Sequence, residues 1–122
     1  MAVDFTADDV LWAAVEHGWA LHPHMTFVGH PIQMPCCPLS IMFHHRFRTV
    51  AYGARKLKEM GDSLGLTETE RRWLVGAFDG MSITRPDVGF EEELDAFDVG
   101  HACRSEFMRL KFARRAAEPE KK

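Results

Sequence analysis

Apolar residues along this chain recur mainly at steps of three and four, which is the spacing of one buried face of an α-helix. The first such segment follows Thr6, whose side chain can cap a helix, and it places Asp8 and Asp9 in the first turn. The apolar run Val10–Val15 continues the segment. The pattern therefore predicts a helix that starts after Thr6 and ends between Gly18 and Leu21.

A stretch rich in proline and histidine follows this helix. Residues 22–38 contain four of the six prolines of the chain, which opposes helix formation because proline lacks the backbone N–H. Within the stretch, residues 25–28 (Met-Thr-Phe-Val) favour a short extended segment. We therefore expect an ordered but irregular crossover here.

A second helix is predicted to begin at Pro38, because proline is favoured in the first turn of a helix. Gly61 and Gly65 would close it, since glycine commonly follows the last turn. Its apolar positions recur at helical steps and are Phe43, Phe47, Val50, Ala54 and Leu57. The spacing predicts one continuous helix between Pro38 and the two glycines.

The third helix has the clearest start signal in the chain, a capping box formed by Thr67-Glu-Thr-Glu70. Gly80 would end it. Its predicted inner face consists of Trp73, Leu74, Ala77 and Phe78.

The last predicted helix follows the three acids at residues 91–93, and Gly100 is a point at which it could divide in two. Its residues in helical register are Leu94, Phe97, His101, Ser105, Met108 and Phe112. The sequence thus predicts a mainly α, small single-domain fold of about four helices over residues 1–115, with an irregular Pro/His-rich crossover. Residues 116–122 form a polar tail that we expect to fray.

The composition of the chain argues against several classes of protein. The chain has 122 residues and a net charge of −3, without the basic excess that is typical of nucleic-acid-binding proteins. It has no apolar stretch long enough for a membrane span and no positively charged signal at its N-terminus. Three cysteines, two of them adjacent, do not suit a disulfide framework. We therefore expect a cytoplasmic protein that binds neither membranes nor nucleic acid.

The central part of the chain concentrates residues that can ligate metals. Six of the seven histidines lie between residues 17 and 45, where Cys36 and Cys37 also stand next to each other. Standard zinc sites pair ligands a few residues apart, whereas adjacent residues point their side chains apart. We therefore expect no cofactor and no metal. If zinc were bound, the candidate ligands would be Cys36, Cys37, His22, His24, His44 and His101.

Cys37 has a second interpretation as a reactive thiol. It precedes Pro38 and can cap the second helix, where exposed amides and the positive end of the helix dipole lower the pKa of a cysteine. A metal-binding or thiol-redox protein that uses Cys36 and Cys37 is therefore an alternative, beside the simpler interpretation that both cysteines pack as small apolar residues. His101 we interpret as a core histidine in the apolar seam of the last helix.

Positive charge is concentrated between Arg46 and Lys58, where five basic residues occur without an acid. On one continuous helix, Arg48 and Arg55 would share a face with His45 and Tyr52, and we interpret these four residues as a contact stripe.

The nine residues at positions 66–74, LTETERRWL, are similar to the opening of LuxR-type DNA-binding domains, which implies a helix-turn-helix regulator as a further alternative. The resemblance stops there, because the segment that would hold the recognition helix is acidic and contains Pro86.

The first predicted helix carries the functional hypothesis that we favour. Apolar residues lie on nearly all sides of this helix, which is typical of a central helix or of one covered by another chain. No motif matches a catalytic signature, so we expect a non-enzymatic accessory, inhibitor or regulatory protein that acts through a helical face. Its partner would be another protein or a second copy of itself. The candidate contact residues are Trp12, Trp19, Arg48, Tyr52 and Arg55.

Overall fold

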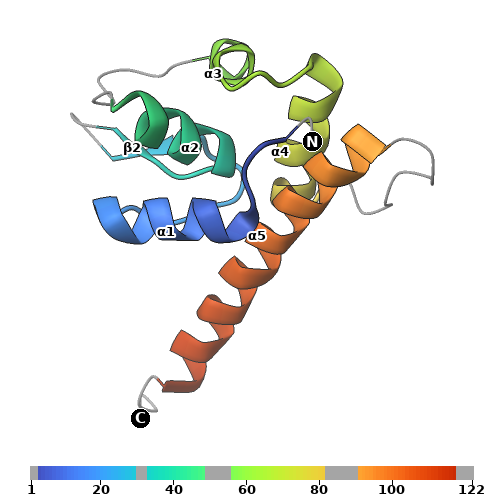
Figure 1. Cartoon of the computed structure of the whole chain (residues 1–122). Coiled ribbons are helices and arrows are strands. Elements are labelled where there is room, and N and C mark those ends of the chain that lie inside the picture. Colours follow the sequence, from blue (N-terminus) through green and yellow to red (C-terminus); the bar gives the residue numbers. More distant parts are fainter. Residues whose placement is uncertain (1–2, 30–32, 49–55, 82–90, 118–122) are drawn as a thin grey trace.

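Helices form most of this chain, as the sequence predicted (Figure 1). The computed structural model describes residues 3–29, 33–48, 56–81 and 91–117, with the side chains of the last range described over 94–113. The elements in chain order are α1 (Ala7–His17), β1 (Phe27–Val28), β2 (Met34–Pro35), α2 (Pro38–Phe47), α3 (Leu57–Ser63), α4 (Glu68–Asp79) and α5 (Glu91–Ala117).

Caps define α1 and α4 at both ends, as predicted. The Thr6 side chain accepts a hydrogen bond from the backbone N–H of Asp9, and the Asp9 carboxylate accepts one from the backbone of Thr6. Thr67 and Glu70 form the same reciprocal box at the start of α4. Each helix ends at a glycine in the left-handed conformation, which the absence of a Cβ makes accessible.

The predicted second helix is wrong in one respect, because two helices occupy its range and the described fold has five helices. The first of them, α2, ends at Phe47, where Arg48 adopts a left-handed conformation with a φ of 47°. The second, α3, begins only at Leu57, and residues 49–55 lie outside the described part of the chain. Phe47, expected on the apolar face, is 49% exposed.

The crossover between α1 and α2 is held by backbone hydrogen bonds. Strands β1 and β2 pair in antiparallel orientation, with Phe27 opposite Pro35. The Cys36 N–H donates to the Thr26 carbonyl at 3.0 Å, and the Ser40 hydroxyl donates to the same oxygen at 2.9 Å. The predicted extended segment is thereby confirmed, and its pairing ties the crossover to the first turn of α2.

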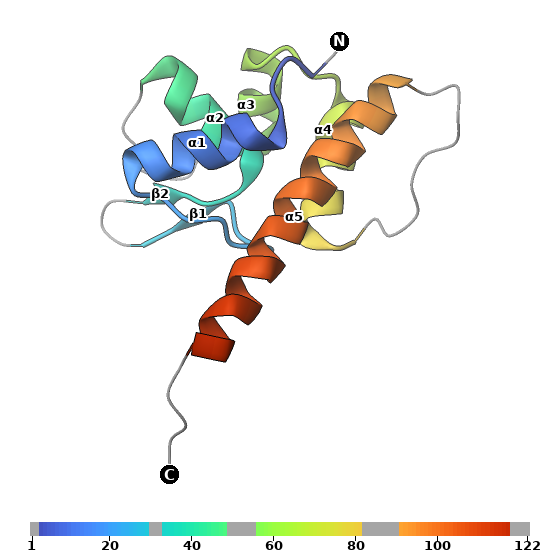
Figure 2. The same ribbon diagram turned by 60° about the horizontal axis from the view of Figure 1, so that its bottom comes forward.

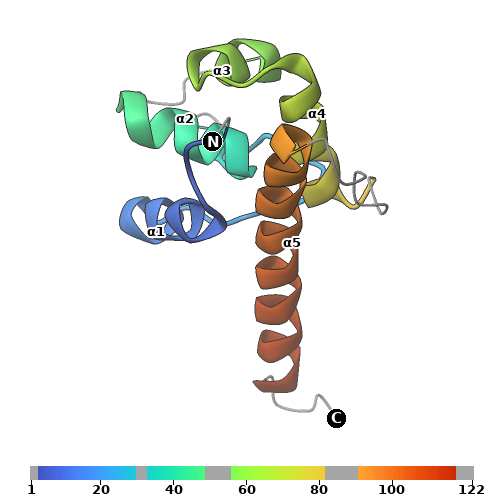
Figure 3. The same cartoon turned by 45° about the vertical axis from the view of Figure 1, so that its right-hand side comes forward.

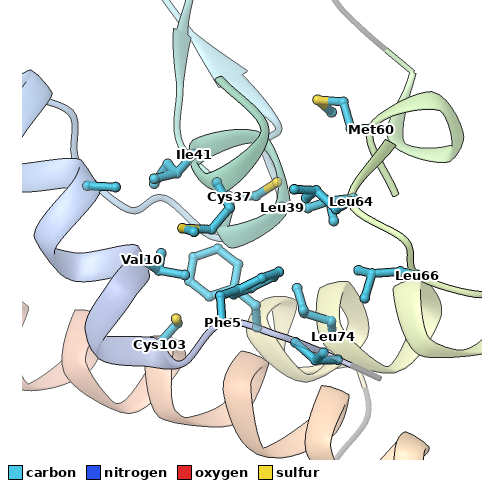
Figure 4. Close-up of a cluster of buried hydrophobic side chains, with 14 of the residues drawn as sticks. Phe5, Val10, Cys37, Leu39, Ile41, Met60, Leu64, Leu66, Leu74 and Cys103 are labelled. Carbon is cyan, nitrogen blue, oxygen red and sulfur yellow. The ribbon is translucent and has the colours of Figure 1, made fainter. Parts of the chain in front are cut away.

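One hydrophobic cluster connects all five helices (Figure 4). Phe5, which precedes α1, is 2% exposed and lies in the middle of the cluster in this view. The predicted inner face of α4 is confirmed at Leu74, Ala77 and Phe78, which are all buried. A charged member of α4, Glu70, is also buried, at 2% exposed, where its carboxylate completes the capping box.

Helices α4 and α5 approach each other closely at Gly100. A Cβ added at Gly100 would stand 2.1 Å from the Leu74 carbonyl oxygen, a distance at which real atoms overlap. Gly100 therefore does not divide α5 but lets it run continuously past the α4 backbone. The Arg104 guanidinium strengthens the contact by donating to the Phe78 carbonyl at 3.1 Å.

Beyond this contact, α5 extends away from the other elements (Figures 1 and 2). Cys103 is the last buried residue among the described side chains of α5, and those from 104 to 113 are half-buried or exposed. None of the described helices has the length and hydropathy that crossing a membrane would need.

We predict that Gly100→Ala lowers the free energy of unfolding by about 3 kcal/mol, and the melting temperature by roughly 10 °C, because the added methyl collides with backbone. Gly61→Ala is the matched control. That glycine is also helical, but an added Cβ meets a movable atom, Arg71 Cδ, at 3.1 Å, so higher helix propensity should keep or raise the melting temperature. Equal effects of the two substitutions in thermal melts would contradict the packing assigned to Gly100.

Candidate functional site

The three cysteines are all free and buried. Cys37 caps α2, as predicted: its sulfur accepts a hydrogen bond from the Ser40 N–H at 3.4 Å, and its own N–H donates to the Ser40 hydroxyl at 3.1 Å. The Cys36 thiol donates to the Met25 carbonyl at 3.2 Å. Both adjacent cysteines therefore take part in the local packing and capping of the crossover.

The expected low pKa at Cys37 is wrong. Burial raises the pKa of this thiol, and its effect exceeds the opposing hydrogen bonds from Ser40 and from the Leu39 backbone. Burial, followed by the neighbouring Cys37, raises the pKa of Cys36 to about 12. Because the thiolate is the nucleophile and the metal ligand, these environments disfavour both chemistries.

The candidate zinc ligands do not gather into one site within the described residues. The His22 ring donates to the Pro23 carbonyl at 2.9 Å, and the backbone of His24 donates to Asp79 at 2.8 Å. His44 is buried against Phe27 and Phe43. No three members of the set Cys36, Cys37, His22, His24, His44 and His101 meet with metal-ligand geometry within the described residues.

His101 is not the core residue that we expected. It lies on the exposed side of α5, and its ring stacks on Phe97 with the ring centroids 5.6 Å apart. Among the described side chains of α5, the buried residues are Ala96, Phe97, Gly100 and Cys103. The apolar seam of this helix therefore contains Gly100 rather than its neighbour His101.

A different group of ligand-type side chains does converge, at the ends of α1 and α2. It contains Glu16, His17 and His45, whose ligand atoms all lie within 4.8 Å of one another. Sequence reasoning missed this group because His17 and His45 are 28 positions apart and only the packing of α1 against α2 joins them. The usable signal was the occurrence of both histidines in last turns of helices.

The predicted contact tryptophans occupy different environments. Trp12 is 74% exposed on α1, and Val15, one turn further on, is 75% exposed. Trp19 follows the left-handed Gly18, so it does not continue the face of the helix; it is half-buried and stacks on His17 at 4.2 Å. The apolar circumference of α1 is therefore only partly covered within the chain.

A groove of about 760 Å³ runs between the end of α1 and the extended part of α5. Its walls are mainly apolar, and the charged Glu106 and Lys111 stand on α5 beside it. Its lining residues include Leu11, Val15, Trp19, Leu21, Phe107 and Leu110. A second hollow beside it is lined by Asp8, Leu11, Trp12 and Val15, which makes the apolar surface continuous across α1.

The predicted stripe on the second helix is not one surface in the described structure. Arg48 is exposed, but its left-handed backbone ends α2, so the helical register that would align it with later residues stops there. Tyr52 and Arg55 lie outside the described residues.

Comparisons with protein-family models, curated proteins and solved structures found no match to this chain.

We predict that the buried thiols make the free energy of unfolding fall as pH rises above 9. Burial raises the pKa of Cys103 from its usual 9.0 to about 12, so between these values the unfolded chain loses a proton that the native protein keeps. Urea unfolding at pH 8 and pH 10 should therefore show a smaller loss of stability in Cys103→Ala than in the wild type. Equal losses of unfolding free energy in the two proteins would contradict the raised pKa of the buried Cys103 thiol.

Proposed function

We propose that this protein is a non-enzymatic protein-binding protein, of the accessory, inhibitor or regulatory kind, whose α1 surface and adjoining groove bind a second copy of the same chain. The single observation that carries the proposal is the exposure of Trp12 and Val15 beside an apolar groove. Large apolar side chains exposed next to one another on a small domain are typical of an interaction surface, and tryptophan is the side chain most enriched among interface anchors.

The shape of α5 supports a second copy as the occupant. The part of this helix beyond Cys103 has no buried side chain over 104–113, yet it carries Leu110 at 49% and Phe112 at 57% exposed. A helical segment of this length is only marginally stable in water without packing. The groove of one chain is a suitable receptor for this segment of the other, in the way that amphipathic helices bind apolar grooves.

Charge supports the same arrangement. Within α1 the charged residues other than histidine are Asp8, Asp9 and Glu16, all exposed acids. Residues 104–117 carry five basic residues against one acid. A basic α5 segment laid along the acidic α1 of a second copy would bring opposite charges together, and a two-fold axis would repeat the contact.

The proposed setting is the cytoplasm. The three cysteines are free in the folded chain, which suits a reducing compartment.

We predict that the wild-type protein is a dimer in sedimentation equilibrium and that Trp12→Ala weakens association at least about thirtyfold, since an interface anchor contributes about 2 kcal/mol or more. The melting temperature of the dissociated Trp12→Ala chain should be close to that of dissociated wild type, because Trp12 packs little within its own chain.

Met81→Ala is the matched control, because Met81 is 78% exposed but follows the Gly80 cap of α4 and does not line the groove. It should leave the association constant unchanged. A wild type that stays monomeric at all concentrations, or equal losses of association in both variants, would refute the proposal.

A further inference from the structure

The C-terminal ends of α1 and α2 lie next to each other, and both helices run in the same direction (Figures 1 and 3). Glu16 and His17 are the last two residues of α1, while His45 belongs to the last turn of α2. Two helix C-termini therefore meet at one place. The dipole of each helix places partial negative charge there, which favours a bound cation.

The three side chains have the separations of metal ligands. His17 Nε2 lies 3.1 Å from His45 Nδ1, and Glu16 Oε2 lies 3.8 Å from the same nitrogen. Two nitrogens bound to tetrahedral zinc at about 2.05 Å are themselves about 3.4 Å apart. The two histidine nitrogens would thus need to move by only a few tenths of an ångström, while the exposed Glu16 carboxylate, which lies within 4.8 Å of both, would swing in by rotation of its side chain.

We propose that Glu16, His17 and His45 form a binding site for a divalent transition-metal ion, with zinc as the expected ion. Two imidazoles and one carboxylate suit zinc, copper and nickel rather than magnesium or calcium, which prefer oxygen ligands alone. Glu16 is 61% exposed and His45 is 32% exposed, so water can reach the ion and complete its coordination. The ion joins α1 to α2 within one chain, and the site does not depend on self-association.

The surroundings of the site favour ligation. The indole of Trp19 stacks on the His17 ring with an interplanar angle of 15°, which holds the ring in place. The neighbouring cation, Arg46, is directed elsewhere: its guanidinium pairs with Asp4 at 2.8 Å and lies over the Phe5 ring. Its charge is therefore balanced by a carboxylate outside the site.

This site differs from the zinc set considered from the sequence. It contains neither of the two cysteines of that set and none of its four histidines. Because its members are exposed or half-buried, the ion would sit on the surface of the α1–α2 pair rather than in the core.

The test is a titration of metal-free protein with zinc chloride by calorimetry, together with thermal melts. We expect one zinc ion per chain, a melting temperature that rises with zinc, and an affinity that falls at least about tenfold in His17→Ala and in His45→Ala. His101→Ala is the control, because His101 is also exposed and stacked on an aromatic ring but lies outside the group. It should bind zinc as the wild type does.

A second experiment measures tryptophan fluorescence while copper chloride is added. Because Trp19 contacts His17, a copper ion at the site should quench part of the emission, and Trp19→Phe should lose this quenching while it keeps the zinc affinity. His17→Gln and His45→Gln, checked for native helicity by circular dichroism, separate loss of a ligand from loss of folding. Weak binding that is equal in the wild type, the His17 and His45 variants and His101→Ala would overturn the proposal, as would absence of stoichiometric binding.

Discussion

The contact of α5 with the backbone of α4 at Gly100 is the constraint on which the arrangement of this protein depends. Because Gly100 has no side chain, α5 passes the Leu74 carbonyl closely enough that a Cβ there would lie 2.1 Å from its oxygen. This contact fixes the line of a 27-residue helix, whose described side chains are half-buried or exposed over residues 104–113. Beyond the contact this helix extends away from the other elements, and the groove lies between it and α1 with the residues that follow α1.

Much of the fold followed from local signals in the sequence. The boxes at Thr6 and Thr67 and the glycines at 18 and 80 fix helix ends through hydrogen bonds within a few residues, so they can be predicted without knowing the tertiary structure. The end of α2 could not be predicted in this way, because Arg48 takes a left-handed conformation that is uncommon for a residue other than glycine. Helical spacing of apolar residues continued past it, and the spacing alone suggested one helix.

The candidate sites were less predictable, because they depend on burial and on long-range packing. Cys37 was placed correctly at a helix start, but burial outweighs the local effect of that position on its pKa. His101 was assigned to the seam of α5, whereas the seam is at Gly100 and Cys103 and turns His101 outward. His17 and His45 meet only because α1 and α2 pack side by side, which no spacing along the chain encodes.

The proposed self-association would place a second copy of the chain over the distal part of α5. Amide hydrogen exchange measured at low and high protein concentration tests it most directly, because it reports protection along this segment without any substitution. If a second copy covers this segment, the amides over 104–113 and along α1 exchange more slowly at high protein concentration, while those of α4 are unchanged. Exchange over 104–113 that is independent of concentration would contradict it.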